Sequence, residues 1–209
     1  HVTLSTVMQC FWGIVLSRYN DPPKNDGLYD LTFGSVVSGR PAEVPGVEQM
    51  VGLFINTIPV RLNFTNQEPV QTILQRLQTA SAIAQEHAYL PLADIQTEPG
   101  MLDHILAFEN YPLDQQLAAA AQKGALGFFI EKVEAVEQTP YDLNLVFVPG
   151  SYLQVSFRYN QARYSEDQLR RVFEQLKQIA RIVLADDTIS VGDIDVLPSS
   201  ERLQLERFN

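Results

Sequence analysis

The spacing of apolar residues indicates three long helices in this chain. In each, apolar side chains recur at intervals of three and four residues, as in a helix that buries one stripe. The pattern runs through residues 3–19, 69–87 and 165–185. Thr3 or Ser5 can cap the first helix, and Ser165 with Gln168 has the spacing of a capping box at the start of the last. We therefore expect three helices with defined ends.

Strict alternation of apolar and polar residues indicates strands between these helices. The clearest case is residues 58–64, where Ile58, Val60, Leu62 and Phe64 share one face. Pro59 predicts that this strand lies at a sheet edge or carries a bulge. Further strands are expected at residues 29–37, 104–109, 127–137, 143–148 and 151–159. The last two are predicted to form a hairpin across a Pro-Gly turn.

Interleaved helices and strands predict an α/β fold. We expect a two-layer sandwich, in which helices pack on a mixed sheet. Two segments leave alternatives open: residues 42–51 form a loop or a helical turn, and the alanine-rich residues 117–122 form a short helix or a mobile loop. There is no internal repeat.

Composition excludes several classes of function. The chain has 209 residues, of which 45% are apolar, enough for one core. Its net charge of −10 argues against nucleic-acid binding. No apolar run approaches the length of a membrane span. One cysteine, Cys10, and three scattered histidines predict no disulfide and no metal site. The chain begins at His1 without a signal peptide, so we expect a cytoplasmic fragment of a longer protein.

The residues alone do not identify a catalytic centre. Ser35 and Ser38 lie between glycines, but the spacing is not that of a nucleophile elbow. Asn56 is the residue that needs explanation. If the alternation of residues 58–64 extends backwards, its amide lies on the apolar face, where an unpaired amide costs about 1–3 kcal/mol. Asn56 therefore either bonds to backbone groups or lines a polar channel, and the pattern leaves both alternatives open.

Six segments together resemble the C-terminal half of a condensation domain of nonribosomal peptide synthetases. Residues 29–41 are similar to its Y…FG…SGRP segment, 51–57 to its G-x-F-x-N-T segment and 87–96 to its H…PL…IQ segment. The other three are residues 3–19, 108–112 and 157–160. The residues that carry the motifs include Tyr29, Phe33, Gly34, Arg40, His87 and Pro91. Arg40 is expected to make a structural ion pair, and Trp12 is expected in the core.

This resemblance implies one lobe of a chloramphenicol acetyltransferase-like pair, with a tunnel between the lobes. Substrates would arrive on phosphopantetheine arms of upstream and downstream peptidyl carrier domains, with no cofactor bound directly. The amine of one substrate would attack the thioester of the other and form a peptide bond. By the same resemblance, Gly52, Phe54, Asn56 and Thr57 would line the tunnel, with Asn56 as a positioning residue.

The chain departs from the family in one respect, because the active-site signature HHxxxDG is absent. We therefore expect no catalytic residue in this chain, and an isolated fragment that is inactive without the N-terminal lobe. Two alternatives stay open. One is a docking platform for carrier domains, and the other is a lobe of an epimerisation or heterocyclisation domain.

The resemblance also predicts the organisation of the chain. Residues 1–197 would form the C-terminal lobe, and residues 198–209 resemble the start of the linker to an adenylation domain. The expected partners are the N-terminal lobe, two carrier domains and the downstream adenylation domain. An isolated lobe would expose the apolar face that its partner covers, so self-association into dimers is expected.

Overall fold

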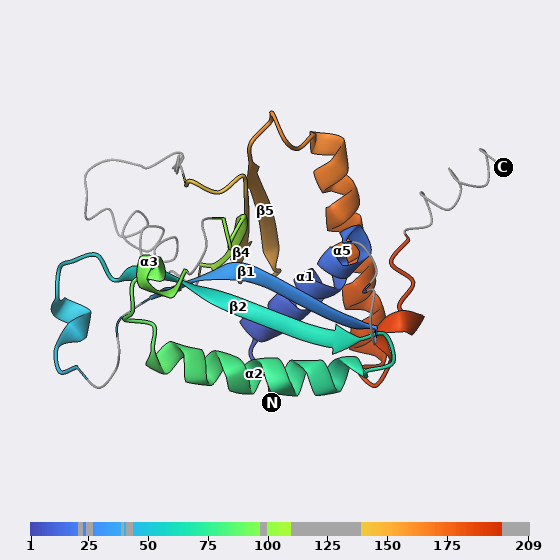
Figure 1. Ribbon diagram of the computed structural model, residues 1–209, viewed down its shortest axis with the longest axis horizontal. Coiled ribbons are helices and arrows are strands. Elements are labelled where there is room, and N and C mark those ends of the chain that lie inside the picture. The colour runs from blue at the N-terminus through green and yellow to red at the C-terminus, as the bar shows by residue number, and fades with distance from the viewer. Residues whose placement is uncertain are drawn as a thin grey trace.

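A computed structural model describes residues 1–20, 23, 27–38, 40, 44–96, 100–109 and 139–197 of the chain. The elements run in the order α1 (Leu4–Tyr19), β1 (Leu28–Ser38), η1 (Val47–Gln49), β2 (Ile55–Thr65), α2 (Val70–Glu86), α3 (Leu92–Ile95), β3 (His104–Phe108), β4 (Leu143–Val148), β5 (Gln154–Tyr159), α5 (Glu166–Ala185) and η2 (Val191–Asp193). Figure 1 shows their arrangement.

The described strands form one mixed sheet in the order β2-β1-β3-β4-β5. The two outer pairs, β1 with β2 and β4 with β5, are antiparallel. The inner pairs, β1 with β3 and β3 with β4, are parallel. The mixed α/β architecture expected from the sequence is therefore confirmed. Strand β2 is the last strand of the described sheet on its side, as Pro59 predicts, because an edge strand tolerates a residue without an N–H.

Helices α1, α2 and α5 pack together against the sheet and enclose the core (Figure 1). Helix α1 contacts α2, α5 and β1, so it lies in the middle of the fold. The alternating side chains of β2 supply the sheet side of the core: Ile58, Val60, Leu62 and Phe64 are all buried, as predicted. This packing surrounds α1 with other elements rather than leaving one of its faces to solvent.

Helix α1 differs from its prediction for this reason. We expected a helix with one buried stripe, but most positions from Thr6 to Ser17 are buried. Gly13 allows the close approach, since a Cβ there would lie 2.1 Å from Cδ2 of Leu62. Polar residues of α1 are consequently buried as well, Gln9 among them. A helix buried all round shows weak amphipathic periodicity.

The remaining predicted elements agree with the structure where it describes them, with one exception. The strand predicted for residues 151–159 begins only at Gln154, because residues 150–152 form a bend. Thr3 caps α1, accepting a hydrogen bond from the Thr6 N–H, and the capping box of Ser165 with Gln168 is present at α5. The predicted hairpin is β4 with β5. The short helix α3 was not predicted. Residues 117–122, 127–137 and 198–209 lie outside the described residues, so those predictions and the linker stay untested.

Candidate functional site

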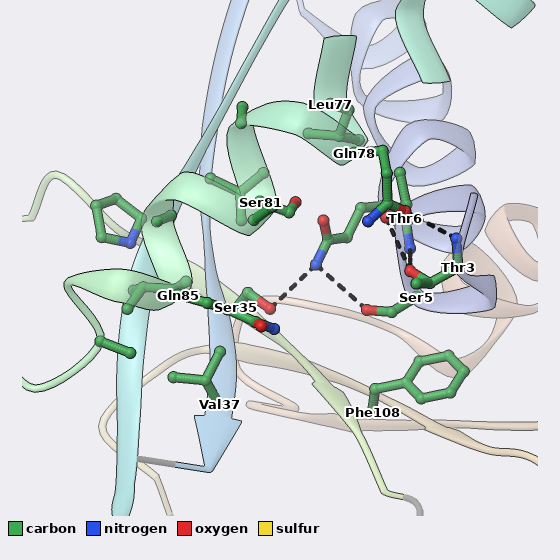
Figure 2. Close-up of a pocket in the computed structure, with 18 of the residues that line it drawn as sticks. Thr3, Ser5, Thr6, Ser35, Val37, Leu77, Gln78, Ser81, Gln85 and Phe108 are labelled. Atoms are coloured by element: carbon green, nitrogen blue, oxygen red, sulfur yellow. Dashed lines mark hydrogen bonds between the residues drawn. The ribbon is translucent and has the colours of Figure 1, made fainter. Parts of the chain in front are cut away.

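A cavity of about 900 Å³ lies between α1, α2, the end of β1 and the middle of β2. It exists because the second half of α2 presents small side chains toward the sheet, among them Ala80, Ser81 and Ala84. Figure 2 shows residues of α1, of α2 and of the sheet around it, with the Phe108 ring on one side. The described lining is almost uncharged, since Arg61 and Glu86 are its only ionisable side chains besides Tyr89.

One wall of this cavity is held together by hydrogen bonds between α1 and α2. The side-chain carbonyl of Gln78 accepts from the Thr3 backbone N–H and from the Thr6 hydroxyl, both at 2.8 Å. Figure 2 shows these bonds beside the start of α1. Because Thr3 is also the N-cap of α1, the first turn of this helix is fixed against α2.

A second polar pair lies deeper, where α1 faces β1. The Gln9 side-chain N–H donates to the Ser35 hydroxyl at 3.1 Å, and a 3.5 Å contact reaches the Ser5 hydroxyl. Gln9 is only 7% exposed, and its Oε1 atom has no hydrogen-bond partner among the described residues. A buried unpaired acceptor of this kind costs about 1–3 kcal/mol. Gln9 and Ser35 both belong to the cavity lining.

Asn56 hydrogen-bonds to the turn that follows α2, and this turn forms part of the cavity wall at Ala88. Its side-chain N–H groups donate to the backbone carbonyls of Ala88 and Leu90, at 2.8 and 2.7 Å, and its Oδ1 accepts from the Thr57 N–H. The side chain is half-buried. Of the two alternatives for Asn56, the structure therefore has the backbone-bonded amide. A further role at a tunnel stays a prediction, although Ala88 itself lines the cavity.

The other predicted tunnel residues surround Asn56, and none of the four is part of the cavity lining. Gly52 is exposed, and Phe54 is half-buried beneath the guanidinium of Arg40, which lies 4.0 Å from the centre of its ring. Thr57 is on the opposite face of β2, beside Gly34. The cavity and the predicted tunnel segment therefore meet at Ala88, whose carbonyl accepts from Asn56, while the tunnel assignment itself stays untested.

Arg40 has two contacts among the described residues, the Phe54 ring and a hydrogen bond to the Val47 carbonyl. The expected ion pair stays a prediction, because acidic residues near Arg40 in sequence, such as Glu43, lie outside the described residues. This cation–π contact fixes the segment before β2 to the end of β1. It therefore gives Arg40 a structural role.

The remaining motif residues have identifiable places. Tyr29 and Phe33 are buried on the core face of β1. Gly34 lies on the opposite face, where a Cβ would come within 2.9 Å of Thr57 and 2.7 Å of Ile105, so a side chain does not fit there. His87 is the exposed C-cap of α2. Pro91 is the N-cap of α3.

Trp12 and His104 form a buried polar contact that belongs to the core. The indole N–H donates to Nε2 of His104 at 2.8 Å, and Nδ1 of the same ring bonds to Asp103. Since an indole N–H only donates, Nε2 is the acceptor, and in the neutral ring the proton lies on Nδ1. The His104 hydrogen bond lowers the pKa of the Asp103 carboxyl below its usual value. Trp12 is a core residue, as expected.

Neither a metal site nor a membrane span is found in the part of the chain that the structure describes. No group of three or more histidine, cysteine, aspartate or glutamate side chains could hold a metal ion there. Within the same ranges, no helix has both the length and the apolar character needed to cross a membrane.

Gln9, Gln78 and Ser81 were not predicted from the sequence, and Ser35 was considered only as a rejected nucleophile. A signal was present for Gln9, because a glutamine between Met8 and Cys10 interrupts a run of buried residues. Its importance depends on α1 being enclosed on all sides, and that follows from tertiary packing. The small residues of α2 are visible in the sequence, but the space they leave is not.

Comparisons with known proteins agree on one family. The family model described as Condensation domain matches residues 1–206. Tyrocidine synthase 2 of Brevibacillus parabrevis is 38% identical over 98% of the chain and 6% of its own length. Bacitracin synthase 3 of Bacillus licheniformis is 36% identical over 98% of the chain and 3% of its own length. The chain thus spans less than a tenth of either relative.

A solved structure supports the same fold. The crystal structure of holo-AB3403, a four-domain nonribosomal peptide synthetase bound to AMP and glycine, superposes with a TM-score of 0.75 at 15% identity. The match covers 96% of this chain and 16% of the other. At that identity the likeness concerns the fold alone.

Proposed function

Because the chain belongs to the condensation domain family, we propose that it forms the C-terminal lobe of a peptide-bond-forming condensation domain in a nonribosomal peptide synthetase. The observation that carries this proposal is the family match over residues 1–206. In the intact domain, the amine of a carrier-bound aminoacyl thioester attacks the carbonyl of a carrier-bound acyl or peptidyl thioester. The new amide forms, the carbon–sulfur bond breaks, and the donor carrier keeps a free thiol.

The absence of the family signature supports assigning the chain to one lobe only. The three histidines of the sequence are His1, His87 and His104, and none are adjacent. His104 is buried and its ring nitrogens are occupied by Trp12 and Asp103, so it is not free to act on a substrate. The general base or positioning group of the reaction would then come from an N-terminal lobe, and the isolated chain would be inactive.

Exposed apolar side chains at the start of β2 support a contact with that second lobe. Val51 and Leu53 are almost fully exposed, and Ile55 is more than half exposed. A contiguous apolar segment of this kind is typical of an interaction surface. In the proposal this segment faces the N-terminal lobe, and self-association of the isolated chain is the consequence of leaving it uncovered.

Asn56 supports a location for the reaction at the same end of the sheet. It follows directly after the exposed segment and holds the turn after α2 through two carbonyl groups. In the proposal, Asn56 and Thr57 form part of the tunnel wall and keep its shape. Carrier domains would present the substrates on phosphopantetheine arms, and a downstream adenylation domain and a cytoplasmic location are parts of the same proposal.

The proposal is tested by joining the chain to its missing lobe. The chain alone and the two-lobe protein are each mixed with loaded donor and acceptor carriers, and the dipeptidyl or acyl-aminoacyl product is measured by mass spectrometry. The two-lobe protein should form an amide, and the chain alone should not exceed background. Turnover by the isolated chain, or epimerised or cyclised product in place of the amide, would contradict the proposal.

A variant of the two-lobe protein separates a tunnel role from carrier docking. Asn56→Ala should lower the condensation rate and leave carrier affinity unchanged, because it loosens the wall without altering the outer surface. Asn63→Ala, on the exposed side of the same strand, is the matched control and should leave both unchanged. Weaker carrier binding with an unchanged rate at saturation would favour docking instead.

A further inference from the structure

The Gln9 side chain is held at one end and free at the other. Its N–H group is bound by Ser35, while Oε1 has no partner in the described part of the chain. The residue is more than nine-tenths buried, and it lines the cavity between α1 and α2. Native proteins pair nearly all buried polar atoms, so an orphan acceptor beside a cavity indicates a missing hydrogen-bond donor.

Ser35 supplies the complementary group. Its oxygen accepts from Gln9, and no acceptor for its own hydroxyl hydrogen is found among the described residues. Figure 2 shows the Ser35 hydroxyl among the side chains around the cavity. Gln9 Oε1 and the Ser35 hydroxyl therefore offer one acceptor and one donor side by side. A carboxamide carries the matching pair, an N–H that donates and a carbonyl that accepts.

The charge of the lining favours a neutral ligand. Arg61 is engaged by Asp30 through two hydrogen bonds, at 2.7 and 2.5 Å. The other charged residue of the described lining is Glu86, at the exposed end of α2. Other lining residues such as Gln78 and Ser81 are uncharged. An ionic group would lose its hydration there without gaining a counter-charge.

We propose that Gln9 and Ser35 form a carboxamide-binding site in this cavity, which selects for a neutral amide group of the substrate. The ligand's N–H donates to Oε1 of Gln9, and its carbonyl accepts from the hydroxyl of Ser35. The inference rests on the proposed function, in which the ligand is part of an aminoacyl or peptidyl chain. The two groups belong either to an asparagine or glutamine side chain of the substrate, or to its backbone. In the backbone case they are the N–H and the C=O of one extended residue, because those of a single trans peptide group point in opposite directions.

Titration of the 209-residue chain followed by NMR tests this site without any condensation assay. The probes are N-acetylglycine N-methylamide, N-acetylglutamine N-methylamide, and methyl acetoxyacetate, a diester of the same shape as the first probe without its N–H groups. The two amides should shift the side-chain NH₂ resonances of Gln9 in a saturable way, and the diester should not. Equal binding of both amides indicates a peptide group as the ligand, and preference for the glutamine probe indicates a side-chain amide.

Variants identify the residues responsible. Gln9→Met keeps the length of the side chain and removes its polar atoms, so it should weaken binding of the amide probes by about tenfold. Its unfolding midpoint in urea should equal or exceed that of the unmodified chain, because an unpaired acceptor is lost. Ser35→Ala removes only the donor and should weaken binding by a similar factor. Gln71→Met, at an exposed position of α2 outside the cavity, is the control.

The inference is overturned if neither amide probe shifts the resonances of Gln9, or if the diester binds as well as the amides. It is also overturned if Gln9→Met and Ser35→Ala bind the probes normally, the result expected if only a water molecule pairs with Oε1. Amide formation by the two-lobe protein together with any of these results would remove this site and leave the proposed function intact.

Discussion

The indole N–H of Trp12 donates a 2.8 Å hydrogen bond to Nε2 of His104, and this bond joins the central helix α1 to strand β3. Both residues are buried. Trp12→Phe should lower the free energy of unfolding by about 1–3 kcal/mol, because it leaves the ring nitrogen of His104 without a donor. Urea denaturation followed by circular dichroism measures this change.

A double variant provides the control for this contact. When both partners become apolar, no unpaired nitrogen remains, so Trp12→Phe combined with His104→Leu should cost less than the two single changes together. Strictly additive losses would mean that the hydrogen bond contributes nothing beyond packing.

Asp103 makes a small part of the stability depend on pH. The His104 hydrogen bond lowers the pKa of this carboxyl in the folded state. Its contribution is therefore complete above the unfolded-state pKa of about 3.9 and is lost as the pH falls through the lower folded-state value. The side chain is 77% exposed, which limits the contribution to less than about 1 kcal/mol. Asp103→Asn should be less stable than the unmodified chain near neutral pH, and the difference should shrink as the pH falls below the unfolded-state pKa of about 3.9. A difference that grows on acidification would contradict this assignment.

Gly34 is a position where packing excludes any side chain. A Cβ there would lie 2.7 Å from Cγ2 of Ile105 and 2.9 Å from Cγ2 of Thr57. Both neighbours are β-branched and have little rotameric freedom. We expect Gly34→Ala to destabilise the fold by about 1–3 kcal/mol, measured by thermal or urea unfolding. Gly150→Ala is the matched control, because its Cβ would make an ordinary 3.5 Å contact with the Tyr152 carbonyl oxygen and should change little.

The reactivity of the buried Cys10 thiol can be used to measure how often the core opens. Burial raises the pKa of its thiol to about 12, and it is the single cysteine of the chain. The folded chain should therefore resist a thiol reagent such as DTNB at pH 8, and it should react at the rate at which it unfolds. Stability should fall as the pH rises above about 9, since the unfolded thiol ionises there and the folded one keeps its proton. Rapid stoichiometric labelling of the native chain would contradict the buried location.

The fold was predicted well where the periodicity was strict. The alternation from Ile58 to Phe64 indicated the buried face of β2, and Pro59 indicated an edge or a bulge, of which the described sheet has the edge. The capping box of Ser165 likewise marked the start of α5. Such local signals depend on near neighbours in the chain, so they survive folding unchanged.

Features that depend on distant contacts were missed. The all-round burial of α1 arises because α2, α5 and β1 enclose it, and no helical periodicity indicates that. The unpaired Oε1 atom of Gln9 and the cavity beside it also depend on this tertiary packing, so the sequence did not predict them. Asn56 was recognised as exceptional from its pattern, but its partners, the carbonyls of Ala88 and Leu90, could be found only from the structure.

In the described sheet, the outer strand pairs join strands that are close together in sequence, and the inner pairs join strands that are farther apart. This arrangement has a consequence for the order of folding. Antiparallel hairpins lie at both ends of the sheet, whereas the parallel contacts of β3 with β1 and β4 join segments far apart in sequence. Closing long loops is slow, so we expect each hairpin to form early and the central strand to dock last. Because His104 is the first residue of that strand, its capture by Trp12 would complete the assembly of the domain.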